Sequence, residues 1–168
     1  MMYEVSEQDK NDAKHPHDIF LINLIVNHIL VFVGLIGMAT SYPYLMLIVP
    51  AISAIVLTYI MMRAKRSLKE DSWFVKCHWQ LCAQRSKIFI IMIALMAVLL
   101  AAVMLIAGGD PKPQHYAIGG VVMLPVLVTV LVLIIMESDA VNQARHGQLP
   151  KSLAERFPNP NAVVLSED

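Results

Sequence analysis

The chain has 168 residues, of which 57% are hydrophobic and only 15% are charged. A soluble domain usually carries about a quarter charged residues, so this composition argues against a water-soluble protein and favours a membrane protein. The formal net charge is zero, and there are two cysteines. These values exclude a general nucleic-acid binder and a disulfide-stabilised secreted domain.

Four segments are apolar and long enough to cross a bilayer, which takes roughly 20 apolar residues per helix. They run over residues 19–40, 45–62, 88–107 and 117–136, and none contains Asp, Glu, Lys or Arg. The first is not a cleaved signal peptide, because the residues before it are acidic and the apolar run is too long. The sequence predicts an all-α integral membrane protein with four transmembrane helices in two hairpins, 19–62 and 88–136.

The distribution of basic residues predicts the orientation of the spans. Residues 63–87 contain seven basic side chains: Arg63, Lys65, Arg66, Lys69, Lys76, Arg85 and Lys87. The short links on the other side carry a single one, Lys112. Loops rich in Lys and Arg stay in the cytoplasm. We therefore expect a multi-pass protein of the cell inner membrane, with the acidic tail 1–18, the loop 63–87 and the C-terminal tail 137–168 all cytoplasmic.

The basic segment 63–87 also shows a helical pattern. Phe74, Cys77, His78 and Leu81 recur on one side, while basic and amide side chains recur on the other. This pattern predicts an amphipathic helix at the inner membrane surface that leads into the third span. Seven basic and two acidic residues give the segment a charge of +5. The charge either fixes topology alone or forms a docking surface for acidic lipid or an acidic partner.

Several turn and breaker residues predict where helices end or bend. Gly147 predicts that the last helix continues past the membrane to about His146. Residues 157–161 are typical of a turn, and 162–168 are expected to be a flexible tail. Pro50 and Pro125 are expected to bend their helices.

Three polar side chains lie deep in the first span: Asn23, Asn27 and His28. Polar groups at such depth are costly and indicate a functional site by default. The simpler alternative is that all three form hydrogen bonds to neighbouring helices and hold the bundle together.

No cofactor is expected, but haem is the alternative worth testing. Axial ligation needs a histidine that is opposed by a second histidine or a methionine. His28 has no histidine at matching depth, whereas the spans contain several methionines, among them Met46, Met92, Met96, Met104 and Met123. Methionine in a core more often fills gaps, so the sequence alone does not predict haem.

No metal site is expected either, although Cys77, His78 and Cys82 are candidates, with His15 and His17 as further ligands. His78 and Cys82 are four residues apart and share a helix face. The spacing of the two cysteines is not the usual one for zinc, and they point apart on a helix.

The sequence contains no motif of an enzyme, so we expect no catalytic activity and name no catalytic residues. The expected role is a non-catalytic accessory or assembly subunit of a membrane complex. Its partners would be the lipid bilayer and other membrane subunits or a second copy, with no nucleic acid. The alternatives are a haem-binding redox subunit and a small-solute transporter or channel.

Overall fold

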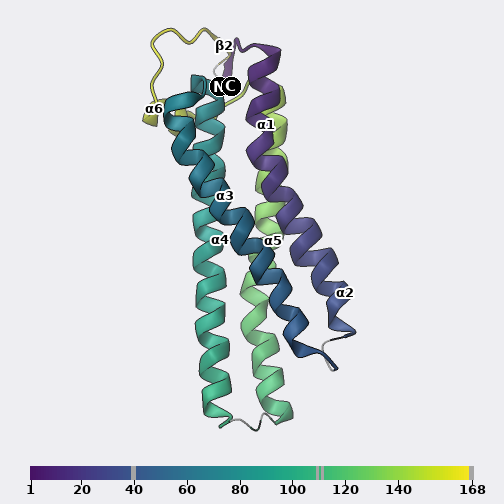
Figure 1. The fold of residues 1–168 in the computed structure, drawn as a ribbon. Helices are drawn as coiled ribbons and strands as arrows, with labels where there is room; N and C mark the ends of the chain where they lie inside the picture. The colour runs from purple at the N-terminus through teal and green to yellow at the C-terminus, as the bar shows by residue number, and fades with distance from the viewer. Residues whose placement is uncertain (39–40, 109, 111, 167–168) are drawn as a thin grey trace.

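The computed structural model describes residues 1–38, 41–108, 110 and 112–166 and is almost entirely helical. Four long helical rods form a bundle, with a small sheet at one end (Figure 1). The first rod joins α1 (Glu7–Ile22), η1 (Asn23–Val31) and α2 (Phe32–Ile36), and the second joins η2 (Pro43–Leu47) and α3 (Ile48–Glu70). The others are α4 (Trp73–Ile106) and α5 (Pro113–Arg145), followed by the short α6 (Lys151–Arg156).

Each expected span coincides over most of its length with a helix that is long and apolar enough to cross a membrane. There are four such helices in the described residues: Glu7–Ile36, Tyr44–Glu70, Trp73–Ile106 and Pro113–Arg145. The prediction of an all-α protein with four candidate spans is therefore confirmed. Thr40, the last residue of the first expected span, lies outside the described residues.

The helices are longer than a membrane requires. The 34 residues of α4 extend about 50 Å, against about 30 Å for the hydrocarbon core of a bilayer. The uncharged stretch of α4 lies in its later part, so the excess is at its beginning. We call this end of the bundle, which also holds both chain termini and the turn between α3 and α4, the polar end (Figure 1).

The segment 63–87 differs from the expected loop. Helix α3 continues to Glu70 and α4 begins at Trp73, so only Asp71 and Ser72 separate them. The amphipathic pattern is confirmed, because Phe74, Cys77, His78 and Leu81 are all buried. However, α1, α5 and the C-terminal segment cover this face, and α4 is one unbroken helix. The expected helix along the membrane surface is thus replaced by a packed extension of the bundle.

The chain ends close the polar end. Ser6 caps α1 by accepting a hydrogen bond from the Asp9 amide at 3.1 Å. Gly147 ends α5 with a φ of +68°, which confirms the predicted helix end. Strand β1 (Met2–Tyr3) pairs in antiparallel fashion with β2 (Val164–Ser166), so these residues are not the expected flexible tail. Glu167 and Asp168 lie outside the described residues.

Contacts between the four rods form the interior of the bundle. Helix α1 contacts both α4 and α5, and α3 contacts α4 and η1. Figure 1 shows α4 and α5 running alongside one another, while α3 crosses the view obliquely.

Pro50 lies in the first turn of α3, where a missing N–H breaks no helical hydrogen bond. The expected bend at Pro50 is therefore not imposed.

Candidate functional site

We call Asn23, Asn27 and His28 the polar stripe. Its two asparagines hold η1 against α3. Asn23 donates a hydrogen bond to the Ser53 hydroxyl at 3.2 Å. Asn27 donates to the Val49 carbonyl at 2.9 Å and to the Asn23 side-chain oxygen at 3.2 Å. All of these side chains are buried, so the asparagines serve the packing role that was one of the two alternatives.

His28 is arranged differently. Its Nδ1 lies 3.0 Å from the carbonyl oxygen of Asn23, and the rest of its ring packs edge-on against Phe89. A carbonyl can only accept, so Nδ1 carries the hydrogen and the neutral ring keeps a lone pair on Nε2. No described residue donates a hydrogen bond to Nε2. The protein therefore fixes one tautomer and leaves an acceptor nitrogen available.

The helix geometry explains how Asn23 and His28 meet. Residues Asn23–Val31 form a π-helix, in which each turn closes on the fifth residue instead of the fourth. In an α-helix a side chain five positions on would face away from the Asn23 carbonyl. The π-helix is rare, and its short form, a single π turn within an α-helix, occurs frequently at functional sites.

A cavity of about 360 Å³ adjoins His28 in the apolar part of the bundle. Its walls come from all four rods and are almost wholly aliphatic, apart from His28, Phe32 and three methionines: Met46, Met96 and Met123. Among the described lining residues, His28 carries the one polar side chain. Binding sites for small ligands commonly have this composition, an apolar wall with a few convergent polar groups.

The seven basic residues of 63–87 do not form one surface. Lys65, Arg66, Lys69 and Lys87 are exposed, as expected. Arg63 bonds to Asp71 at 2.7 Å and lies over the Trp79 ring, and Lys76 lies over the Phe157 ring. Arg85 is buried, which corrects its expected place on the surface.

Arg85 pairs with a buried carboxylate from α5. Its Nη1 donates to Glu137 Oε1 at 3.1 Å and to the Met136 carbonyl at 2.8 Å. The other carboxylate oxygen, Oε2, lies 2.5 Å from His17 Nδ1, and His17 Nε2 lies 3.0 Å from His78 Nδ1. A chain of polar contacts thus crosses the polar end from α4 through α5 and α1 and back to α4.

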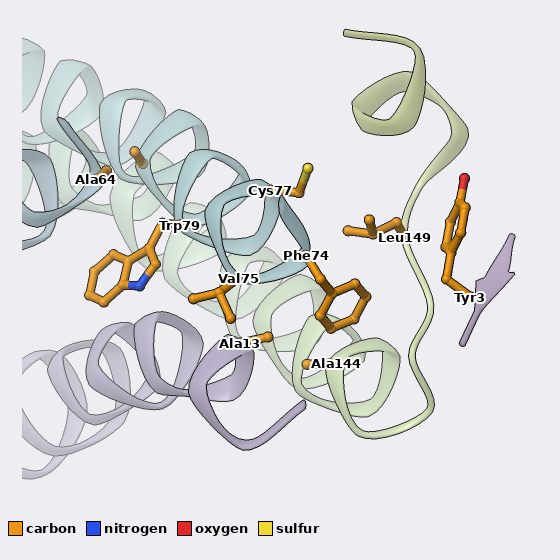
Figure 2. Packing of buried hydrophobic residues seen from close by; sticks show 10 residues of the cluster. Tyr3, Ala13, Ala64, Phe74, Val75, Cys77, Trp79, Ala144 and Leu149 are labelled. Atoms are coloured by element: carbon orange, nitrogen blue, oxygen red, sulfur yellow. The ribbon is translucent and has the colours of Figure 1, made fainter. Parts of the chain in front are cut away.

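The structure separates the candidate metal ligands into two groups. Cys82 lies beside His17 and Glu137, and His78 contacts His17. Cys77 instead belongs to the apolar cluster that includes Phe74 and Leu149 (Figure 2). His15 packs against Trp79 and does not join the group. Glu137 could not be identified as a member from the sequence, because it is 120 residues from His17 and has no local motif.

No family model matches the chain, and no curated protein or solved structure does either. The chemistry of the His28 cavity and of the buried polar chain must therefore carry any functional argument.

Proposed function

We propose that the chain is a small multi-pass membrane protein that binds a neutral, membrane-soluble aromatic ligand with a hydroxyl group, of the quinol class, in the His28 cavity. The observation that carries this proposal is the free acceptor Nε2 of His28 in an otherwise apolar wall. His28 is partly buried and lines apolar surroundings, where an acceptor without a donor is costly, and a ligand hydroxyl would satisfy it.

The wall of the cavity supports the class of ligand. Thioether sulfurs make favourable contacts with aromatic rings, and Met46, Met96 and Met123 line one cavity. Methionine side chains also adapt to irregular shapes. A charged ligand would meet no opposite charge among the described lining residues, so the ligand is expected to be neutral. The volume of about 360 Å³ falls within the range of small-molecule sites.

Haem at His28 is a second candidate, because a histidine and three methionines share the cavity. A His/Met pair is a known axial ligand set for haem. Against it, the described lining offers no basic side chain to accompany the two propionates of a haem. An absorption spectrum of the purified protein separates the two candidates, since haem gives a Soret band and a quinol does not.

The location and the wider role are also proposals. Every Lys and Arg of the sequence except Lys112 lies in the segments of the polar end, and this asymmetry between the two ends supports an inner-membrane protein with both termini in the cytoplasm. Holding a ligand without chemistry of its own suits an accessory subunit of a membrane complex. Only 6% of the residues in the most apolar window of α4 are buried within the bundle, so we expect lipid, a partner subunit or a second copy to cover the rest.

The binding test compares a quinol with a short alkyl chain and the dimethyl ether of the same compound, which has no hydroxyl donor. Both are titrated into wild-type protein in detergent and into His28→Leu. We expect the quinol to bind His28→Leu about tenfold more weakly than wild type, since one hydrogen bond is lost. The ether should bind both proteins equally.

His146→Gln is the matched control, because His146 is an exposed histidine at the polar end. It should bind the quinol like wild type. Equal binding of quinol and ether to wild type would contradict a role for Nε2. So would a loss of quinol binding in His146→Gln as large as in His28→Leu.

A further inference from the structure

Three potential metal ligands from three different helices meet at the polar end, outside the His28 cavity. They are His17 on α1, Cys82 on α4 and Glu137 on α5. Their ligand atoms all lie within 4.8 Å of one another, and the three side chains are fully buried. We propose that these residues bind one divalent transition-metal ion of the zinc class. This inference is independent of the proposed function.

The donor set fits such an ion. Imidazole nitrogen, thiolate sulfur and carboxylate oxygen are the three kinds of ligand that Zn²⁺ accepts, and three protein ligands leave a fourth tetrahedral position for water. Magnesium and calcium prefer oxygen ligands throughout and are disfavoured by the thiolate.

Two neighbouring side chains are arranged to orient the ligands. Metal-binding histidines usually use their second ring nitrogen in a hydrogen bond, and metal-binding carboxylates are in turn hydrogen-bonded. His17 Nε2 lies 3.0 Å from His78 Nδ1, and Glu137 Oε1 accepts from Arg85 at 3.1 Å. Both contacts leave the atoms that face each other, His17 Nδ1 and Glu137 Oε2, for the ion.

The charge of the buried cluster stays balanced when an ion enters. A hydrogen sits between His17 Nδ1 and Glu137 Oε2, which are 2.5 Å apart, and the Cys82 thiol donates its hydrogen to the Pro16 carbonyl at 3.3 Å. The ion replaces both protons, which leave to solvent, while His17 keeps the hydrogen on Nε2 toward His78 Nδ1 and is a neutral ligand. Two positive charges leave as two enter, so the interior gains no net charge.

An ion-pair network that only holds the helices together is the competing interpretation. It would explain Glu137 and Arg85, but it gives Cys82 no part in the pairing. Cys82 therefore distinguishes the two interpretations, and the second cysteine, Cys77, supplies a matched control. Both cysteines are fully buried on α4, but Cys77 faces the apolar cluster of Figure 2.

The test titrates Co²⁺ into the full chain in detergent after treatment with a chelator. We expect one ion per chain and a near-ultraviolet charge-transfer band from thiolate to cobalt. Cys82→Ser should lose the band and bind at least about 100-fold more weakly, while Cys77→Ser should keep both. His78→Gln should bind about 10–100-fold more weakly, the usual effect of removing an orienting residue.

Absence of a saturable charge-transfer band in the wild-type protein would overturn the proposal, whether or not any variant folds. Equal losses in Cys77→Ser and Cys82→Ser would also overturn it. Helical content measured by circular dichroism for each variant ensures that weaker binding reflects a lost ligand and not an unfolded chain.

Discussion

Asn27 and His28 are adjacent in the chain and yet have different surroundings. Asn27 points into the contact with α3, where it bonds to the Val49 carbonyl. His28 lines the apolar cavity with a nitrogen that no described residue satisfies. Since both residues stood out in the sequence for the same reason, their polarity at depth, only their neighbours separate a packing residue from a candidate ligand-binding residue.

Replacement of Asn27 by Leu tests the packing role. The change removes hydrogen bonds to Val49 and Asn23, and we expect the free energy of unfolding to fall by about 0.5–1.5 kcal/mol. Thermal unfolding in detergent measures the loss, with the exposed Asn142→Ala as control. If the protein were a transporter that uses Asn27 in its path, Asn27→Leu would abolish uptake while leaving the protein folded.

At the residue scale, the sequence predicted the polar stripe but not that its asparagines pack against α3 while His28 lines a cavity. The π-helix that turns His28 Nδ1 toward Asn23 has no recognised sequence pattern, and the neighbours of η1 come from helices distant in the chain, among them α3 and α5. The sequence also did not predict that His17, Cys82 and Glu137 lie together. Cys82 and His17 were candidates, but Glu137 joins them only through the contacts of α5 with α1 and α4.

At the element scale, the spans were predictable because they depend on composition alone. A run of about 20 apolar residues without charge has few alternatives to a membrane helix. The amphipathic pattern predicted a helix that leads into the third span, but not that α3 continues to Glu70 and that only Asp71 and Ser72 separate it from α4. Arg85 was expected on a basic surface of the cytoplasmic segment 63–87, whereas it is paired with Glu137 inside the bundle.

The end of α5 offers a test of one element. Gly147 has a left-handed φ of +68°, and a Cβ atom there would lie 2.7 Å from the Tyr3 carbonyl oxygen. Gly147→Ala should therefore lower the free energy of unfolding by about 1–2 kcal/mol or more. Thermal unfolding of this variant is compared with that of Gly120→Ala.

Gly120 lies inside α5 with open space around its Cβ position, so its replacement should be neutral or stabilise by up to about 1 kcal/mol. Similar melting temperatures for the two variants would contradict the packing of β1 against the end of α5.

At the scale of the whole molecule, the bundle has two distinct ends. The polar end is tightly packed and contains most of the fully buried side chains, among them Trp79, His17 and Glu137. Toward the other end, large apolar side chains such as Leu105 and Ile106 are more than three-quarters exposed. A protein with this distribution is expected to meet lipid or partner subunits along its apolar rods and water at its polar end.

The proposed orientation predicts the labelling of two introduced cysteines. Lys69 lies in the last turn of α3 at the polar end, and Lys112 precedes α5, whose first turn lies at the other end of the bundle. Both lysines are exposed, and both native cysteines are fully buried. In intact spheroplasts, a membrane-impermeant maleimide should label Lys112→Cys but not Lys69→Cys, which should react only after permeabilisation. The unmodified chain should stay unlabelled. The opposite pattern would place the termini outside the cytoplasm.

The central claim, that the His28 cavity holds a hydroxylated aromatic ligand, is tested most directly on the protein as it leaves the membrane. Wild type and His28→Leu are purified in mild detergent, and native mass spectrometry is combined with analysis of the extracted lipids and of co-eluting proteins. We expect about one quinol-class molecule per wild-type chain, strongly depleted in His28→Leu. Phospholipid alone, in equal amounts on both proteins, would contradict the claim.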